Sequence, residues 1–400
     1  MYRRRRLVAL LLLTSLVLGP WWALSGGDGT PAATTEPGEG GTGVALAEAA
    51  SGPEPGDAAG EGESSALDDE ATVPQACSAA VDALPLRSQL ALLLMVGVGG
   101  DDPGSVADLL ASEHRPGGIF VRGGPEVWED GVLAEPDERG RPLLVAVDDE
   151  GGRVQRLEGI LPALPSAAEM GRLPPEQVQA LAAERAGTMR ALGVDLVFAP
   201  VLDLGEGGGI GDRSFGSDPQ LVARQAGAYA HGLRKGGLLP VVKHFPGEGR
   251  ASGDPHDGPI TAPALDQLRT AELVPYELLL AEGPVGVMVG HLDVPGLTAD
   301  GVPASLSPDA VGLLRASYEF DGLVVTDDLV AMQAVTDRFG IPEAAERALV
   351  AGVDLVLLAN RTDVPAVLDR LVEAVDSGRL LARRVAGALT RLVATSGCDG

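Results

Sequence analysis

Basic residues are scarce in this sequence, and lysine is almost absent. The 400 residues include 57 acidic and 30 basic side chains, a formal net charge of −27, and the only lysines are Lys235 and Lys243. Nucleic acids and anionic lipid surfaces bind proteins through a positively charged face. The composition therefore argues against nucleic acid as a partner, although it leaves room for a local basic pocket that binds a small anionic group.

The familiar cofactor and nucleophile motifs are also missing. The histidines form no HExxH pattern and there is no cysteine cluster, so no metal site is expected. The sequence has no Walker loop, no GxGxxG between a strand and a helix, and no GxSxG turn. What remains is chemistry by carboxylate and imidazole groups, for which no cofactor is expected.

Cysteine occurs only twice, as Cys77 near the start of the expected folded part and Cys398 near the C-terminus. In an exported protein the two could form an intrachain disulfide that joins the ends of the domain. The alternative is a pair of unpaired terminal thiols.

Residues 1–25 have the organisation of an export signal. Arginines occupy positions 3–6, and an apolar run follows at 7–18. This pattern predicts a signal peptide or an uncleaved signal anchor, since the run, even when extended to Leu24, barely reaches the length of a membrane span. We therefore expect a secreted or extracytoplasmic protein, which stays anchored in the membrane if the segment is retained.

The next segment, 26–75, has the composition of a disordered linker. It is rich in Gly, Ala and Pro and holds 11 acidic residues without any lysine or arginine. The absence of apolar periodicity predicts a self-repelling tether. Residues 76–400 are expected to form one catalytic domain, which we predict to be a monomer.

Eight short apolar runs predict β-strands at 92–98, 118–121, 143–147, 194–199, 238–242, 285–289, 323–325 and 353–358. Helical patterns lie between many of them, most clearly at 174–192, 219–234 and 342–350. Strands that alternate with helices form parallel sheets, and eight of them predict an α/β fold of the (β/α)8 TIM-barrel type. An open doubly wound sheet is the alternative.

Ionisable side chains follow five of the predicted strands. In a (β/α)8 barrel such residues meet at the carboxyl ends of the strands, where active sites form. The sequence therefore predicts a carboxylate-rich pocket built from residues 148–156, 203, 212–213, 243–244, 291 and 327–328.

The stretch 243–259, KHFPGEGRASGDPHDGP, concentrates ionisable groups on a loop rich in Gly and Pro. Side chains two residues apart face the same way in an extended segment, so Asp254 can accept a hydrogen bond from the His256 ring. That bond would fix the tautomer of His256 and favour the protonated ring. The alternatives are an Asx turn at Asp254 and a solvated loop histidine at His256.

These motifs resemble glycoside hydrolase family 3, in its branch of single-domain β-N-acetylglucosaminidases. The family pattern KHFPGHG, four residues and then DSH is matched by KHFPGEG, RASG and DPH, and DQEGGRVQR is matched by DDEGGRVQR. APVLDL, IGDRSFG and TDDL match as well, so the resemblance covers roughly residues 86–394. It implies an exported retaining β-N-acetylhexosaminidase that removes terminal N-acetylglucosamine from cell-wall fragments or amino-sugar oligomers through a covalent glycosyl–aspartate intermediate.

The resemblance also implies a role for individual residues. Asp327 corresponds to the nucleophile and His256 to the general acid/base, which Asp254 assists. We expect Asp328 to support the structure. A buried ion pair with Asp212 is the alternative to a sugar contact for Arg213. The residues that resemble the sugar-binding set are Asp148, Arg156, Arg213, Lys243 and His244, and charged groups form the stronger hydrogen bonds to hydroxyls.

Three positions depart from the family pattern. Glu248 replaces the second histidine of KHFPGHG, Pro255 replaces serine in DSH, and Asp149 replaces glutamine. None removes a catalytic group, but Pro255 stiffens its loop and Asp149 adds negative charge beside the sugar-binding set.

Three other functions stay open on the sequence. They are a β-glucosidase, a β-glycoside phosphorylase of the same fold, and a non-catalytic cell-wall sugar-binding protein. The aspartate–histidine couple argues against the first, because the glucosidase branch generally takes its acid from a second domain.

Overall fold

The structure, a computed structural model, describes residues 75–396 except 130, 132, 134–141, 206–208 and 361. The predicted export signal (1–25), the predicted linker (26–75) apart from its last residue, and Cys398 of the predicted disulfide lie outside the described residues. Within the described ranges, no helix combines the length and the apolar character needed to cross a membrane.

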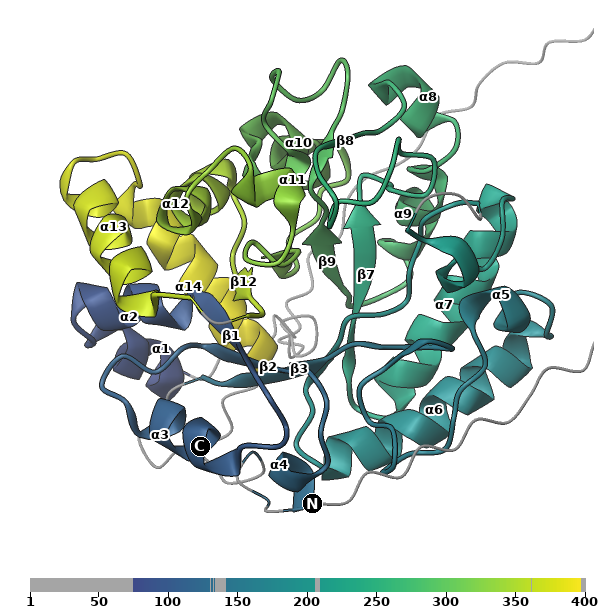
Figure 1. The fold of residues 1–400 in the computed structure, drawn as a ribbon, viewed down its shortest axis with the longest axis horizontal. Helices are drawn as coiled ribbons and strands as arrows, with labels where there is room; N and C mark the ends of the chain where they lie inside the picture. Colours follow the sequence, from purple (N-terminus) through teal and green to yellow (C-terminus); the bar gives the residue numbers. More distant parts are fainter. Residues whose placement is uncertain are drawn as a thin grey trace, which may run out of the picture. The chain divides into compact units, whose positions relative to one another are not determined.

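Eight parallel strands form one sheet whose spatial order follows the sequence (Figure 1). β1 pairs with both β2 and β12, and a bridge between Val325 and Leu355 links β11 to the residue before β12. The sheet therefore closes into the predicted (β/α)8 barrel, and the open-sheet alternative is wrong. The strands are β1 (Leu94–Val98), β2 (Gly118–Val121), β3 (Leu144–Val147), β6 (Leu196–Val197), β7 (Leu239–Phe245), β9 (Gly286–Val289), β11 (Val324–Thr326) and β12 (Val356–Leu358).

The barrel strands are buried on both faces, which is why they stand out in the sequence as unbroken apolar runs. Every residue of β2, β3 and β9 is buried, because one face packs inside the barrel and the other packs against helices. All eight strands overlap the predicted runs. β7 continues to Phe245, three residues beyond its predicted end, so Lys243 and His244 lie within the strand.

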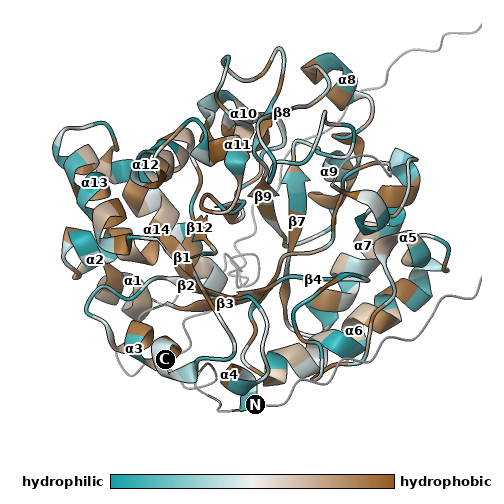
Figure 2. Ribbon diagram, viewed as in Figure 1, coloured by the Kyte–Doolittle hydropathy of each residue, from teal (hydrophilic) through white to brown (hydrophobic). Residues whose placement is uncertain are grey.

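Helices surround the strands, and Figure 2 shows that β3 is largely hydrophobic while the helices carry residues of both kinds. The three predicted helices are confirmed as α6, α7 and α12, with their ends within one residue of the prediction. The helices are α1 (Gln75–Asp82), α2 (Leu86–Leu92), α3 (Pro103–Ala111), α4 (Glu126–Glu129), α5 (Ala167–Met170), α6 (Pro175–Ala191), α7 (Pro219–Lys235), α8 (Leu265–Arg269), α9 (Val274–Leu279), α10 (Pro308–Gly312), α11 (Gln333–Thr336), α12 (Ile341–Ala351), α13 (Val364–Asp376) and α14 (Ala382–Ser396), with the short turns η1 (Gly211–Arg213), η2 (Ala304–Leu306) and η3 (Leu313–Ser317).

The two ends of the folded unit meet, because α1 contacts α14. Cys77 is buried in α1. This contact brings the Cys77 region next to the last helix, as a disulfide between the two ends requires, but its proposed partner Cys398 is outside the described residues.

Two small sheets extend the carboxyl side of the barrel. β4 (Asp149–Gly151) and β5 (Val154–Gln155) form an antiparallel hairpin directly after β3, and β8 (Ile260–Thr261) pairs with β10 (Leu292–Asp293). Gly151 has a φ of 93°, and a Cβ there would lie 2.2 Å from the carbonyl oxygen of Pro165. Only glycine fits this turn, which holds the DDEGGRVQR segment against the barrel.

Two glycines test how closely the backbone is packed, one between neighbouring segments of the barrel and one on the exposed side of a helix. A Cβ on Gly97 in β1 would lie 1.9 Å from the carbonyl oxygen of Ala359, whereas a Cβ on Gly187 in α6 would meet nothing within 4 Å. We expect Gly97→Ala to lower the free energy of unfolding by about 2 kcal/mol or more, and Gly187→Ala to raise it by about 1 kcal/mol. Urea unfolding of both variants measures the difference, and a Gly97→Ala protein as stable as the wild type would contradict this packing.

Candidate active site

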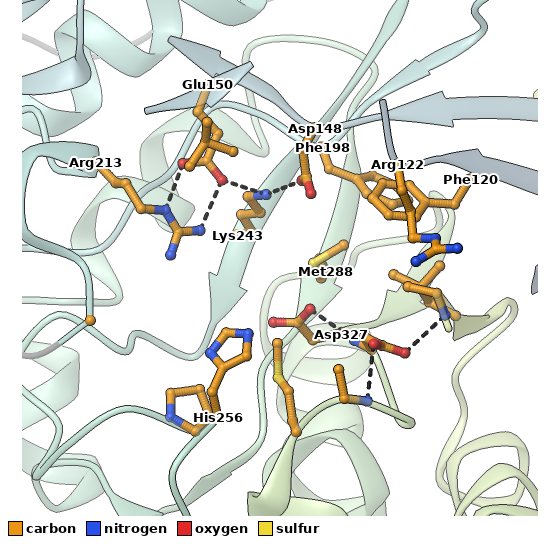
Figure 3. A pocket seen from close by; sticks show the side chains of 18 of the residues that line it. Phe120, Arg122, Asp148, Glu150, Phe198, Arg213, Lys243, His256, Met288 and Asp327 are labelled. Carbon is orange, nitrogen blue, oxygen red and sulfur yellow. Dashed lines mark hydrogen bonds and ion pairs between the residues drawn. The ribbon is translucent and has the colours of Figure 1, made fainter. Parts of the chain in front are cut away.

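A cavity of about 530 Å³ lies at the carboxyl ends of the barrel strands (Figure 3). Residues within or soon after β2, β3, β7, β9, β11 and β12 contribute to its wall, which is the usual place for an active site in this fold. The lining residues are Phe120, Arg122, Asp148, Glu150, Arg153, Val154, Arg156, Phe198, Gly209, Arg213, Lys243, Glu248, Asp254, Pro255, His256, Met288, Asp327, Asp328, Ala331, Met332, Leu357, Ala359 and Asn360.

Lys243 and Arg213 neutralise two carboxylates on one side of the cavity (Figure 3). The Lys243 ammonium lies 2.7 Å from Asp148 Oδ1 and 2.7 Å from Glu150 Oε1. Arg213 donates two hydrogen bonds to Glu150, of 2.7 and 2.8 Å. Burial alone would lower the pKa of Lys243, but the carboxylates of Asp148 and Glu150 outweigh it and raise that pKa above its usual value. This side of the cavity is therefore a charged, hydrogen-bonding wall.

The ion pair suggested between Arg213 and Asp212 is wrong. Asp212 accepts a hydrogen bond of 2.8 Å from Arg153 instead, at the exposed edge of the cavity. Because the two residues stand side by side in the tight turn η1, their side chains leave in different directions. Glu150, which holds Arg213, also lines the cavity.

Arg156 lies where the resemblance implies. Its Nη2 is 4.0 Å from Asp148 Oδ2, and it lines the cavity. Asp149, by contrast, is turned away from the cavity and pairs with Arg185 of α6, with which it is fully buried. The expectation of extra negative charge beside Asp148 is therefore wrong, because Arg185 neutralises that charge.

Asp327 follows β11 directly, and its carboxylate lines the cavity with 7% of its surface exposed. Burial alone would raise the pKa of Asp327, but the nearby His244 and Lys243 and the hydrogen bond from the Asp328 backbone N–H outweigh it and lower that pKa. Asp327 is therefore a buried but ionised carboxylate, as a nucleophile requires.

Asp328 supports the loops around Asp327. Its carboxylate accepts hydrogen bonds from the backbone N–H groups of Val330, Ala331 and Ala359 and from the Asn360 amide. These bonds join the segment after β11 to the segment after β12. The geometry agrees with the structural role expected of Asp328.

His244 differs from the expected sugar contact, since it is the one residue of the predicted catalytic and sugar-binding set that is absent from the cavity lining. Its ring is buried behind Asp327, with Nδ1 2.6 Å from Asp203 Oδ2 and Nε2 3.8 Å from Asp327 Oδ2. Burial alone would lower the pKa of His244, but the carboxylates, Asp203 above all, raise it. The carboxylates therefore favour the protonated form of His244, and Arg213 Nη2 lies 3.3 Å from the same Nε2.

His291, one of the residues expected to build the pocket, is absent from the cavity lining and is a structural neighbour of Asp327. Its Nε2 lies 3.1 Å from the Asp328 carbonyl oxygen and its Nδ1 2.7 Å from the Ser305 hydroxyl. The carbonyl can only accept, so Nε2 carries the proton and Nδ1 accepts from Ser305. Burial lowers the pKa of His291, which favours this neutral form.

His256 and Asp254 form the couple that their spacing predicts. The His256 ring Nδ1 is 2.7 Å from Asp254 Oδ1, and the His256 backbone N–H donates to the same oxygen at 3.0 Å. The Asx turn considered as an alternative is thus present together with the ring contact. Burial alone would raise the pKa of Asp254, but the hydrogen bonds from His256 outweigh it and lower that pKa. Asp254 is therefore an ionised carboxylate that orients the ring.

The sequence did not point to the apolar wall of the cavity. Phe120 and Phe198 stack with ring centroids 5.5 Å apart, and both line the cavity together with Met288 and Met332. Phe120 and Phe198 lie in or beside barrel strands, so their only signal was their place in apolar runs, which core residues share. In the described part of the chain, no group of three or more His, Cys, Asp or Glu side chains is arranged to hold a metal ion.

The fold and the cavity together are those of a barrel glycoside hydrolase, since an ionised carboxylate and a carboxylate-held histidine reach one cavity of sugar size. Comparison with known proteins leads to the same class. The family described as "Glycosyl hydrolase family 3 N terminal domain" matches residues 127–395. The chain belongs to glycosyl hydrolase family 3.

Individual relatives cover most of the chain. The beta-hexosaminidase LpqI of Mycobacterium tuberculosis (strain ATCC 25618 / H37Rv) is 46% identical over 341 residues, which is 81% of this chain and 87% of that protein. The structure of a family 3 member from Mycobacterium smegmatis has a TM-score of 0.74 at 47% identity and covers 79% of this chain and 98% of that one. A family 3 beta-N-acetylglucosaminidase from Paenibacillus sp. has a TM-score of 0.74 at 34% identity, over 78% of this chain and 62% of that one.

The two lysines provide a matched test of the charged wall. Lys243→Met removes the buried cation between Asp148 and Glu150, and we expect the free energy of unfolding to fall by roughly 3–5 kcal/mol, as for other broken buried ion pairs. Lys235→Met, at the exposed end of α7, should change it by less than about 0.5 kcal/mol. Urea unfolding at pH 7 compares the variants, and equal stability would show that Lys243 is not needed to balance these carboxylates.

Proposed function

We propose that the protein is a retaining β-N-acetylhexosaminidase that releases terminal N-acetylglucosamine. The observation that carries the proposal is that Asp327 and His256, the latter held by Asp254, line one cavity whose opposite wall is charged (Figure 3). The names of its relatives support the same activity, since LpqI is called a beta-hexosaminidase and the Paenibacillus enzyme a beta-N-acetylglucosaminidase.

In the first half of the proposed reaction, an oxygen of Asp327 attacks the anomeric carbon of the bound sugar. The bond from that carbon to the leaving oxygen breaks, and His256 donates its Nε2 proton to this oxygen. Because Nδ1 faces Asp254 at 2.7 Å, Nε2 is the ring nitrogen free to act. The product is a glycosyl ester of Asp327 and a neutral leaving group.

The second half reverses these roles. His256 now takes a proton from a water molecule, whose oxygen attacks the anomeric carbon and displaces the Asp327 carboxylate. Two inversions at the same carbon retain its configuration. His244 and Lys243 help Asp327 both to attack and to leave, because their charge stabilises its ionised form.

The charged wall fits the hydroxyls of one terminal sugar. Asp148, Lys243 and Arg213 present both acceptors and donors, and bonds to charged groups are the stronger ones. At the edge of the cavity stand three arginines, Arg122, Arg153 and Arg156, in a chain of net charge −27. They favour a substrate whose aglycone carries a negatively charged substituent, away from the oxygen that His256 protonates. This supports cell-wall fragments as substrates, and it agrees with the export signal predicted at residues 1–25.

Asp327 is tested with p-nitrophenyl N-acetyl-β-glucosaminide. We expect the kcat of Asp327→Ala to fall by about 10⁴-fold or more, as is typical when a covalent nucleophile is removed. The variant should still unfold in a single cooperative thermal transition, as the wild type does. Asp337→Asn, an exposed aspartate in the same region, is the control and should keep full activity. Undiminished turnover by Asp327→Ala would refute the nucleophile assignment.

The same assay separates the alternative functions. A p-nitrophenyl β-glucoside that is turned over faster would indicate a glucosidase, and a sugar 1-phosphate formed when phosphate is added would indicate a phosphorylase. Binding of N-acetylglucosamine without hydrolysis of any substrate would indicate a sugar-binding protein.

His256 is tested by varying the leaving group. His256→Ala should lose about 10²- to 10⁴-fold with a disaccharide, whose leaving oxygen needs a proton, and much less with a dinitrophenyl glycoside, whose leaving group departs as an anion. His231→Ala, at an exposed position on α7, is the matched control. An equal loss on both substrates would show that His256 acts otherwise than as the general acid.

A further inference from the structure

Glu248, which stands where the family pattern has a second histidine, has an unusual environment. Its side chain lines the cavity and is 95% shielded from solvent, since 5% of the residue is exposed. Its backbone N–H donates to Asp203 Oδ1 at 2.5 Å, which fixes the residue in place. Yet in the described part of the chain no hydrogen bond or ion pair involves the Glu248 carboxyl.

An unpartnered buried carboxyl is costly. Removing a polar group from water without a replacement hydrogen bond destabilises the fold by about 1–3 kcal/mol, and the great majority of buried polar groups are paired. The Glu248 carboxyl faces the cavity, where water can be its partner in the free protein and a bound sugar can replace that water.

We propose that Glu248 is a further sugar-contacting residue of this cavity, and that its carboxyl takes its hydrogen-bond partner from the bound sugar rather than from the protein. This inference rests on the proposed function, because that function supplies the sugar. It adds a contact at a position where this chain differs from the family pattern.

The groups around Glu248 determine the form in which it acts. They come from five elements: His244 in β7, Asp203 after β6, Asp327 after β11, Arg213 in η1 and Tyr276 in α9. Burial raises the pKa of Glu248 to about 7, and Asp203 and Asp327 act in the same direction, whereas His244 and Arg213 oppose them. Below pH 7 the carboxyl is therefore mainly neutral, and above pH 7 it is mainly charged.

The neutral form suits a sugar better than the charged one. A neutral carboxyl offers both an O–H donor and an acceptor, as a neutral imidazole does with its two nitrogens, whereas a carboxylate can only accept. Glu248 can thus serve a sugar hydroxyl or amide in the same way as a neutral histidine. Above pH 7 it loses its donor and places a second negative charge near Asp327.

The test measures binding of N-acetylglucosamine by calorimetry, which needs no turnover. We expect Glu248→Ala to weaken binding about tenfold at pH 6, the effect of one lost hydrogen bond. The wild type should bind more weakly at pH 8 than at pH 6. Glu248→Gln, which stays neutral and keeps a donor, should bind within about threefold of the wild type at pH 6 and lose that pH dependence.

Two controls separate a contact from a structural role. Glu343→Gln, at an exposed ion pair on α12, should leave binding and its pH dependence unchanged. Thermal unfolding of Glu248→Gln should give a gain in Tm over the wild type that grows above pH 4.5 and levels off above about pH 7, because in that range the wild-type carboxyl ionises in the unfolded chain but stays mainly neutral in the folded one.

The outcomes distinguish this inference from the proposed function. A wild type that hydrolyses the aryl glycoside, together with a folded Glu248→Ala variant that binds the sugar as tightly, would overturn the Glu248 contact alone. Parallel pH profiles for wild type and Glu248→Gln would do the same. A wild type that neither binds nor hydrolyses N-acetylglucosaminides would overturn both.

Discussion

The desolvation of several carboxylates in one small space is the constraint on which this site depends. Taking an ionised group out of water costs several kcal/mol unless a partner of opposite charge compensates it. The cations buried among these carboxylates are Lys243, Arg213 and a histidine, His244, whose protonation the carboxylates favour. The carboxylates that meet at the carboxyl end of the barrel are Asp148, Glu150, Asp203, Glu248 and Asp327.

The cations divide the site into two parts. Lys243 and Arg213 are committed to Asp148 and Glu150, which makes one wall rigid and able to position a sugar. His244 stands between Asp203 and Asp327 and serves the reacting side. Among the described residues no cation forms an ion pair with Glu248, and burial raises the pKa of this carboxyl although His244 and Arg213 oppose it. At Asp327 the cations outweigh burial, so the pKa values of two neighbouring carboxyls shift in opposite directions.

The strands and helices of the barrel could be predicted from the sequence because each of them depends mainly on the residues within it. A strand buried on both faces needs an unbroken apolar run. The ends of a helix can be predicted where proline stands at its start and glycine follows its end. The rule that polar residues after parallel strands share one rim then brought Asp148, Lys243 and Asp327 into one cavity, although nearly 180 residues separate the first from the last.

The partners of individual side chains could not be predicted in the same way. Arg213 forms its ion pair with Glu150, 63 residues away in the sequence, and not with its neighbour Asp212. Asp149 pairs with Arg185 on a helix and does not line the cavity. His244, which was expected to contact the sugar, is buried beside Asp327 instead. Each of these pairings depends on where a side chain points, and a shift of a few ångströms would change the partner. The apolar periodicity of a sequence does not specify side-chain positions at that scale.

The members of the proposed catalytic pair are held by different means, and Pro255 connects them. Asp327 is fixed by a barrel strand, whereas the His256 side chain is 55% exposed on a loop. That loop is tied down where the Pro255 carbonyl oxygen accepts a hydrogen bond of 3.0 Å from the backbone N–H of Ala334, in the segment that follows Asp327. Proline removes a backbone N–H but keeps its carbonyl group, and it restricts the chain at that point. The replacement of serine by proline therefore leaves the anchoring contact intact, and it lowers the entropy lost when the loop is fixed over the cavity.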